Sequence, residues 1–422
     1  MIGTGIAGMS AAWLLDQSCD VTVYEAESRP GGHSCTVEVE GQPVDMGFIV
    51  YNQATYPNLC ALFDHLGVET RETCMSLGIS LDDGALEYGS RGLRGFIAQP
   101  RNLVSRRFWS MLLDLVRFYR TAPRDLAALT GDDLTLDDYL TLNGYGEAVR
   151  DDHLLPEAAA IWSVPAGKAA DYPARAFIRF FENHGLLKLW NRPQWRTVVG
   201  GARAYADKLT APYRDRIRVG EPVTHVVRKD GAVTVRTASG WFEVFDEVVL
   251  AVHPDQALAL LEQPTAAERK LLGAIRYGAN RVVLHGDPRL MPRRRGVWSS
   301  WNYLGRRRSD APCSVSYWMN QLQGLKGRDL FVSLNPALEP APETVFETRQ
   351  FDHPIFDAAA LTAQSGLRSL QGVKNTWYCG AWFGAGFHED GLQSGLWVAE
   401  TLAGVRRPWT VENESGRIGL GA

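Results

Sequence analysis

The chain has 422 residues, of which 45% are hydrophobic and 22% are charged, and its formal net charge is −4. This composition supports a large buried core, favours two domains over one, and provides no overall positive charge for binding nucleic acid. The 6 cysteines form no CxxC pair, so we expect no metal site, reduced thiols and a cytoplasmic protein without a membrane-spanning segment.

The first predicted element is a glycine-rich turn that runs into a helix, in the stretch MIGTGIAGMSAAWLL. Gly3, Gly5 and Gly8 have the GxGxxG spacing, which allows a tight turn, close approach of a pyrophosphate and close packing of helix on strand. Only Met1 and Ile2 precede Gly3, whereas a strand usually has about five residues. We therefore expect this chain to lack the front of its first strand, and a form extended upstream to hold a dinucleotide more tightly.

The next element is an alternating strand, DVTVYEAE, which ends at Glu25, about 20 residues after the glycines. An acidic side chain at this point accepts hydrogen bonds from the ribose hydroxyls of an adenine dinucleotide. The alternative is a glycine-rich turn followed by an unrelated exposed glutamate. The combination of the two parts favours the dinucleotide site.

Directly after this strand the chain reads EAESRPGGH, which places Arg29 and the pair Gly31-Gly32 behind Glu25. The stretch resembles the extended fingerprint of the FAD-dependent amine oxidase and phytoene desaturase superfamily, in which the glycine pair lets the loop pack over the pyrophosphate and the flavin. The following VDMGFIVYN is similar to the segment that these flavoproteins run beside the isoalloxazine ring, with Gly47 allowing close approach. Without the resemblance, Arg29 would be a surface charge in a plain turn.

The resemblance implies FAD rather than NAD as the cofactor, and an α/β fold with two domains. A Rossmann-type FAD-binding domain, with a parallel sheet and a β-meander, is expected over residues 1–78, 197–272 and 366–410. An inserted α+β substrate domain is expected over residues 79–196 and 273–365, followed by a C-terminal tail over 411–422.

Patterns in the middle of the chain agree with this layout. Residues 79–196 lack alternation, are rich in helix formers and contain six prolines that break the pattern, Pro123 among them, which predicts a helical insertion. Alternating segments joined by Asp230-Gly231 and Ser239-Gly240 predict the meander, in which the resemblance implies a backbone contact to the adenine at Val223. The segments NRVVLHGD, SVSYWMN and DLFVSLN predict strands of the substrate-domain sheet.

The C-terminal stretch CGAWFGAGFHEDGLQSG follows a predicted last buried strand, NTWYCG, and leads into a final helix. Asp390, with Gln393 three residues later, resembles a capping box and predicts that the helix begins at Asp390. The first amides of such a helix carry partial positive charge and suit an anionic reduced flavin. Gly391 and Gly395 would allow the ring to approach, although a simple cap and a glycine loop stay open as the alternative.

A closer resemblance is to the bacterial branch of this superfamily that is associated with cyclopropane, methyl-branched and furan fatty acid formation. It is carried by GFHEDGLQSG and PRRRGVWSSWNY. Two departures from the superfamily pattern matter. A flavin-binding Gly-Asp pair appears here as Gly380-Ala381, and a lysine that amine oxidases often keep near the flavin N5 is replaced by Asn280 and Arg281.

These observations predict an FAD-dependent oxidoreductase that desaturates a fatty acyl chain by hydride transfer to the flavin N5. A flavin amine oxidase, a flavin-dependent fatty-acid isomerase and a non-enzymatic flavin scaffold remain alternatives, and the sequence does not specify the electron acceptor. His388 is the acid/base candidate, with a structural role equally open. The residues expected to bind FAD are Gly3, Gly5, Ile6, Ala7, Gly8, Glu25, Ala26, Arg29, Gly31, Gly32, His33, Gly47, Phe48, Val223, Gly380, Ala381, Asp390, Gly391 and Leu392.

The expected substrate is an apolar small molecule or an acyl lipid, because aromatic side chains are plentiful in the segments assigned to substrate or flavin. Each of these side chains also suits an ordinary core position. The tunnel candidates are Trp298, Trp301, Tyr303, Tyr317, Trp318, Trp382, Phe383 and Phe387.

Residues 91–124 carry eight arginines and one acid, Asp114, despite the negative net charge of the chain. Apolar residues recur there at helical spacing, with Trp109 and Phe118 at the flanks of the stripe. We expect this segment to bind an anionic membrane surface, which would make the protein peripheral on the inner face of the membrane. An amphipathic helix that packs on the core is the alternative.

Overall fold

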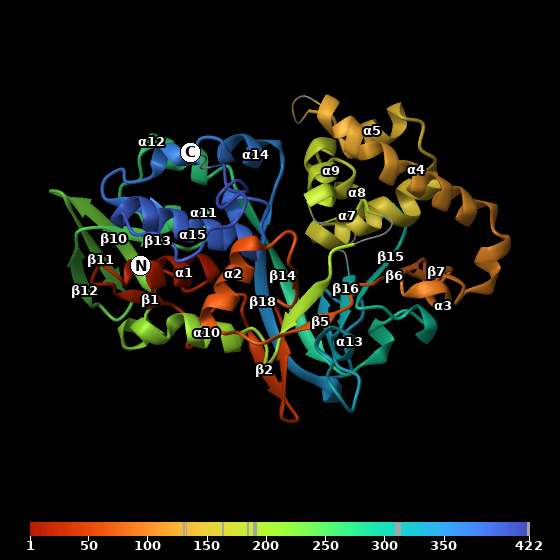
Figure 1. Cartoon of the computed structure of the whole chain (residues 1–422), viewed down its shortest axis with the longest axis horizontal. Helices are drawn as coiled ribbons and strands as arrows, with labels where there is room; N and C mark the ends of the chain where they lie inside the picture. The colour runs from red at the N-terminus through yellow and green to blue at the C-terminus, as the bar shows by residue number, and fades with distance from the viewer. Residues whose placement is uncertain are drawn as a thin grey trace.

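The computed structural model describes residues 1–129, 131, 133–162, 164–183, 185–188, 192–308 and 314–419. A parallel sheet with its helices lies on one side of the molecule and a group of helices lies on the other (Figure 1). The long strands β14 (Arg276–His285) and β18 (Val345–Ile355) run between them. The fold is therefore the predicted two-part α/β arrangement of a flavoprotein.

The parallel sheet is built from short buried strands far apart in the chain. Ile2 bridges in parallel to both β1 and β13, so that the first residues form the middle of the sheet. The Ile2 amide donates to the Val249 carbonyl and the Gly3 amide donates to the Tyr24 carbonyl, both at 2.9 Å. The strands, in spatial order around Ile2, are β9 (Ile217–Val219), β1 (Val23–Glu25), β13 (Val248–Leu250) and β19 (Thr376–Tyr378).

Two helices pack on this sheet and on each other, α1 (Ile6–Leu15) and α15 (His388–Ala403). A Cβ atom on Gly395 would lie 2.2 Å from the carbonyl oxygen of Ala7. Gly395 therefore serves the close packing of α15 on α1 rather than leaving space for a ring. Helices α2 (Pro57–Leu66) and α10 (Arg203–Thr210) lie against the same pair.

The predicted meander is present as β10 (Val223–Lys229), β11 (Ala232–Thr237) and β12 (Phe242–Phe245). Asp230 and Gly231 both have positive φ, 55° and 78°, as a two-residue hairpin turn requires. Helices α11 (Pro254–Leu260), α12 (Ala266–Leu272) and α14 (Ala358–Gln364) cover the neighbouring core.

The substrate region contains a seven-stranded sheet in the order β18-β14-β17-β16-β15-β6-β7. All three segments predicted as its strands are strands. The remaining members of the sheet and its short helix are β6 (Leu77–Leu81), β7 (Leu86–Gly89), β15 (Trp301–Gly305), β16 (Ser314–Trp318), α13 (Met319–Gln323) and β17 (Phe331–Leu334). Two smaller sheets join β2 (Thr36–Val39) to β3 (Gln42–Asp45), and β4 (Tyr51–Asn52) to β8 (Trp195–Val198) and β5 (Thr70–Thr73).

The prediction of a purely helical insertion over 79–196 was wrong at its start, because β6 and β7 form a hairpin there. Four of the five residues of β6 and all of β7 are buried, so neither strand shows the alternation that marks a half-exposed strand. A break at Pro123 was also wrong, since helix α4 (Arg106–Ala128) continues through it. The other helices are α3 (Gly92–Phe96), α5 (Leu136–Leu142), α6 (Glu147–Val149), a π-helical turn (Arg150–Leu154), α7 (Leu155–Trp162), α8 (Ala166–Ala169) and α9 (Ala174–Asn183).

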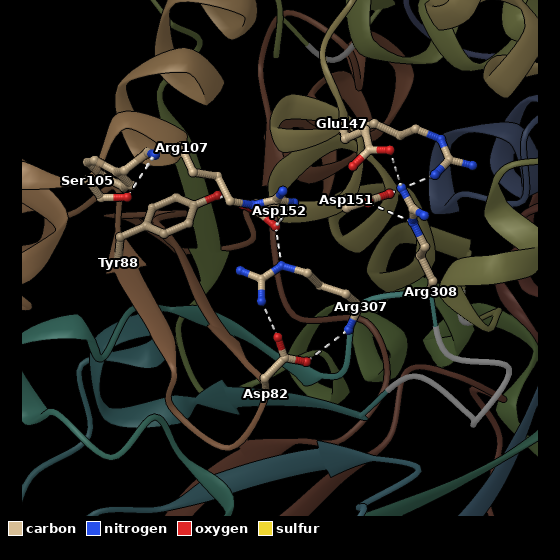
Figure 2. Close-up of polar contacts among 11 residues, drawn as sticks. Asp82, Tyr88, Ser105, Arg107, Glu147, Asp151, Asp152, Arg307 and Arg308 are labelled. Carbon is tan, nitrogen blue, oxygen red and sulfur yellow. Dashed lines mark hydrogen bonds and ion pairs between the residues drawn. The ribbon is translucent and has the colours of Figure 1, made fainter.

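A network of ion pairs joins these helices to the large sheet (Figure 2). The buried carboxylate of Asp152, in the π-helical turn, accepts from Arg107 Nε at 2.7 Å and also from Arg307, which follows β15. Arg307 in turn pairs with Asp82, after β6. Arg308 Nε lies 2.8 Å from Asp151 Oδ2, so four separate segments are tied at one junction.

The residues predicted to form a tail pack on the FAD-binding side. Ile418 is buried, and the Arg417 guanidinium lies 2.7 Å from Asp390 of α15. Residues 420–422 lie outside the described part of the chain, as does Cys313, while the other cysteines are unpaired. Within the described residues, no helix has both the length and the apolarity that a bilayer crossing requires.

Candidate functional site

The glycine turn between Ile2 and α1 has the geometry of a dinucleotide cradle. Gly3 has φ of +97°, and a Cβ atom on Gly8 would lie 2.1 Å from the Gly3 carbonyl oxygen. A Cβ atom on Gly5, in contrast, would meet nothing within 4 Å. Gly3 and Gly8 are therefore required by the turn and by packing, whereas Gly5 faces open space at the start of α1, where a pyrophosphate fits.

Glu25 ends β1 beside this turn. Its carboxylate accepts from the Thr4 amide at 3.0 Å and from the Glu27 amide at 2.8 Å, and it also contacts the Thr4 hydroxyl. The Glu221 amide donates to the Glu25 carbonyl at 3.0 Å, which brings the start of β10, with Val223, to the same edge. Ala26 is exposed next to Glu25. The carboxylate is thus held where a ribose would follow the pyrophosphate.

The loop from Arg29 to Gly32 folds back over the glycine turn. Arg29 Nη2 donates to the Gly32 carbonyl at 2.9 Å, and the Gly31 amide donates to the Thr4 carbonyl at 3.1 Å. Both glycines have positive φ, and a Cβ atom on Gly32 would lie 3.2 Å from Gly5 Cα. Arg29 therefore clamps the loop and is not a free surface charge. Its Nε is buried without an acceptor among the described residues, which leaves a donor for a bound group.

His388 and Phe48 form the centre of the predicted flavin-facing region. Their rings stack with centroids 3.8 Å apart at an interplanar angle of 10°. His388 Nε2 lies 2.6 Å from the Tyr205 hydroxyl and 3.3 Å from the Ser34 hydroxyl. Burial lowers the pKa of His388 to about 3, so the ring is neutral and already engaged. This arrangement fits a positioning role better than that of an acid or base.

A second group of histidines joins His33, which was predicted as an FAD-binding residue, to His253 and His353, which were not predicted from the sequence. The His33 ring lies 4.7 Å from the Phe351 ring and 5.6 Å from the His353 ring, both on β18. His253 stacks on Tyr277 at 3.9 Å. Burial lowers the pKa of His33 well below its usual range, and its Nε2 is buried without a partner among the described residues. The only signal in the sequence is a proline directly after His253 and His353.

Asn280 and Arg281 occupy the strand where amine oxidases often keep a lysine. Asn280 is buried, and its amide nitrogen lies 3.2 Å from His353 Nδ1 while its oxygen accepts from Asn335 at 2.7 Å. Arg281 is on the other face of β14, where it pairs with Glu339 on the surface at 2.8 Å. Neither residue offers a cation to the histidine group.

The start of the final helix differs from the prediction. Helix α15 begins at His388, two residues before Asp390, and Asp390 Oδ2 accepts from the Phe387 amide at 2.8 Å and the Ala385 amide at 3.0 Å. Asp390 thus reaches back from within the first turn instead of preceding it. The ion pair with Arg417 then balances its charge. Gly391 packs on Ile6, and Leu392 is buried on the same side.

The pair Gly380-Ala381 is held by a residue that the sequence did not single out. Ser394 Oγ accepts from the Gly380 amide at 2.9 Å and lies 3.1 Å from the Gly380 carbonyl. The serine hydroxyl therefore fixes the backbone where the superfamily pattern has an aspartate. Gly47 is also set by close packing, because a Cβ atom there would lie 2.1 Å from the His33 carbonyl oxygen.

The aromatic residues that were predicted to line a substrate tunnel lie partly in the core and partly near the site. Trp382 and Phe383 belong to the core beneath the parallel sheet, and Trp298 packs in a small separate cluster with its indole donating to the Pro292 carbonyl at 2.7 Å. These three are core residues. Phe387 is half-buried and stacks on Phe180 of α9 at 5.1 Å, which joins α15 to the helices of the substrate region. The others, Trp301, Tyr303, Tyr317 and Trp318, lie on β15 and β16.

The fold and this site define a two-domain FAD-dependent oxidoreductase. Residues that fit the cofactor converge from the glycine turn, Glu25, the Arg29 loop and α15. Residues 6–294 match the family described as flavin containing amine oxidoreductase, and the chain belongs to that family.

Several known proteins are similar to the chain. It is 25% identical over 347 residues to AofH of Mycobacterium tuberculosis, named as a flavin-containing monoamine oxidase, which covers 78% of this chain and 67% of AofH. It is 26% identical over 263 residues to the flavin-containing amine oxidase A of the dog, covering 60% of this chain and 49% of that enzyme. The match thus spans about half the length of the dog enzyme.

Solved structures share the fold over nearly the whole chain. A putrescine oxidase bound to putrescine superposes with a TM-score of 0.69 at 16% identity, covering 95% of this chain and 97% of that chain. A fatty acid isomerase from P. acnes, which produces CLA, gives a TM-score of 0.65 at 18% identity, covering 95% and 96%. At these identities the likeness establishes the fold alone.

Proposed function

We propose that the protein desaturates a fatty acyl chain, leaving a double bond between two neighbouring carbons. When bound, FAD would supply the acceptor for the hydride of one carbon, and an external two-electron acceptor such as oxygen or a quinone would take the electrons onward. The neighbouring carbon loses a proton, and the electron pair of that C–H bond forms the double bond. The protein must therefore position an apolar chain, exclude water and accept one proton.

The observation that carries this proposal is the neutral state of the buried histidine group, beside which the carboxylate of Asp352 is only half-buried and that of Asp255 is exposed. Burial holds the pKa of His353 near 4 and the pKa of His388 near 3, so both rings are neutral. The buried carboxylates nearby are already engaged: Asp390 with Arg417, and Glu389 with Asn58 and Gln393. An ammonium substrate would have to be desolvated beside neutral rings, with only solvent-accessible carboxylates such as Asp352 and Asp255 near it, whereas an acyl chain needs no counter-charge.

We assign His33 as the proton acceptor. Its neutral ring lies between the Arg29 loop and β18, where the two parts of the molecule meet, and its Nε2 has no partner among the described residues. His388 is the alternative, but its Nε2 is occupied by Tyr205 and Ser34. We therefore give His388 the task of holding Phe48 in place.

The test is anaerobic incubation of the purified protein with fatty acyl lipids and with amines, following the flavin absorbance and the lipid product. We expect acyl lipid to bleach the flavin and to yield one double bond for each flavin reduced. His33→Gln should keep the flavin spectrum but bleach about 100-fold or more slowly. The matched control His225→Gln, on the exposed meander surface, should behave as the wild type.

Amine oxidation is the second candidate, because the chain belongs to the amine oxidoreductase family and its relatives AofH and amine oxidase A bear that name. Bleaching by amines and not by lipids would replace the desaturase proposal with this one. A shifted double bond without lasting bleaching would indicate isomerisation and would also contradict desaturation.

A further inference from the structure

The connection between α3 and α4 presents an apolar surface to solvent. It lies at the edge of the molecule farthest from the parallel sheet (Figure 1). Monomeric proteins seldom gather large exposed apolar side chains in one short segment without a use for them. The members of this tip surface, with their exposed fractions, are Ile97 (44%), Leu103 (44%), Val104 (85%), Trp109 (47%) and Leu113 (72%).

Core packing does not account for the tip surface. The inner face of α4 is already formed by Phe108, Met111 and Phe118, which are buried. Trp109 and Leu113 are four residues apart and share the outer face. The prediction that Phe118 flanks an exposed stripe was wrong, because its side chain is fully buried, while Val104 lies just before the helix begins. Helix α4 therefore has two apolar faces, of which one is unpacked at its N-terminal end.

The tip surface is held in shape by local bonds. The Trp109 indole nitrogen donates to the Leu103 carbonyl at 2.8 Å, and the Ser105 hydroxyl accepts from the Phe108 amide as the N-cap of α4. The indole nitrogen of Trp109 is thus hydrogen-bonded within the protein, while the ring itself remains half exposed. An indole with this arrangement suits the boundary between lipid headgroups and acyl chains.

The arginines of this segment form two classes. Arg107 and Arg117 have structural partners, in the Asp152 network (Figure 2) and in Asp114 respectively. Arg94, Arg101 and Arg106 are exposed and pair with no acid in the part of the chain that the structure describes. These three alternate in sequence with Ile97, Leu103 and Val104 of the tip surface and precede Trp109. Unpaired cations beside exposed apolar side chains complement an anionic surface with an apolar interior.

We propose that residues 94–113 dock the protein on an anionic lipid bilayer, with the tip surface in the headgroup layer and the three arginines on lipid phosphates. The inference rests on the proposed function in one respect, since a membrane is where acyl substrates are stored. Docking involves no turnover, however, so vesicle binding and flavin bleaching fail or succeed separately. Acyl lipid presented in detergent micelles tests the desaturase proposal without the bilayer.

The experiment is flotation of the purified protein with vesicles of phosphatidylcholine alone and of phosphatidylcholine mixed with phosphatidylglycerol, at low and high salt. The wild type should float with the anionic vesicles at low salt and be released by high salt. Arg101→Glu/Arg106→Glu should lower the partition coefficient by about 30-fold or more. Val104→Asp should lower it by about tenfold, because the exposed side chain no longer enters the headgroup layer.

The matched control is Arg120→Glu/Arg124→Glu, which makes the same change of charge on exposed positions of the same helix but away from the tip surface. It should reduce binding by less than about threefold. Equal losses from the two double variants would overturn the assignment of the site. A wild type that ignores anionic vesicles at low salt would overturn the lipid proposal.

Discussion

The edge of the parallel sheet around the glycine turn and the junction around Asp152 are stabilised in different ways. At the glycine turn, backbone segments pack directly on one another: Gly8 lies against Gly3, Gly32 against Gly5, and Gly395 against Ala7. At the junction, charged side chains from four segments meet over a carboxylate that is 1% exposed. In the first region an added methyl group at Gly8 or Gly395 would overlap backbone atoms, although Gly5 leaves room for one, whereas the second region depends on keeping every charge paired.

The largest effect is expected at the glycine turn. Gly8→Ala would place a methyl group 2.1 Å from the Gly3 carbonyl oxygen and should destabilise the protein by about 3 kcal/mol or more, with loss of bound FAD. Thermal unfolding and the flavin content after purification measure the two effects.

Gly5→Ala is the matched control, because its methyl group meets no protein atom and its φ of −60° suits alanine. The flavin-free protein should keep its stability within about 0.5 kcal/mol, while FAD affinity falls at least about tenfold. Equal destabilisation by both variants would contradict the separate roles of the two glycines.

A smaller effect is expected at the junction. Asp152→Asn keeps the shape of the side chain but leaves Arg107 and Arg307 without their shared carboxylate, and should lower the free energy of unfolding by about 2 kcal/mol. Asp83→Asn, which breaks an exposed pair with Arg306, should cost less than about 0.5 kcal/mol. Urea unfolding compares the variants, and similar losses would show that burial of Asp152 contributes little.

The last effect concerns pH at the site, and it is absent at neutral pH and grows only as the pH falls below 6.5. Burial lowers the folded-state pKa of His388 to about 3 from its usual 6.5, so below pH 6.5 the unfolded chain takes up a proton that the folded chain refuses. The His388 contribution to stability is complete above pH 6.5 and declines by about 1.4 kcal/mol per pH unit as the pH falls toward 3.

His388→Gln should remove this part of the acid sensitivity, as measured by unfolding between pH 7 and about pH 4.5. His225→Gln, at an exposed position, serves as the control and should leave the pH dependence as in the wild type. An unchanged pH dependence in His388→Gln would mean that the folded protein protonates His388 after all.

The sequence was informative where a short motif encodes backbone geometry. The glycine spacing, the Asp230-Gly231 turn and the polar start of α15 each predicted an element that the structure contains. The hairpin of β6 and β7 was missed because strands buried on both faces lose their alternation. Alternation identifies a strand only where one face meets water, whereas the buried helix α1 and the buried strand β17 were predicted from other signals.

The residues expected to bind FAD could be grouped from the sequence, whereas the residues on the substrate side could not. The cradle residues lie in contiguous motifs, so that their grouping follows from the chain itself. The histidine group and the Asp152 network bring together residues that are far apart, such as His33 with His353 and Asp82 with Arg307. No local pattern carries such pairings, because they depend on how the seven-stranded sheet and the helices are placed relative to each other.

The position of Ile2 in the middle of the parallel sheet has a consequence for how the protein folds during synthesis. Ile2 bridges to Tyr24 of β1 and to Leu250 of β13. Strand β13 in turn pairs with β19, which begins at Thr376. The helices between residues 106 and 183 rely on contacts near in sequence and can form first, whereas contacts of such long range close slowly. The dinucleotide-binding sheet is therefore complete only after Thr376–Tyr378 has left the ribosome, and FAD cannot find a finished site before that point.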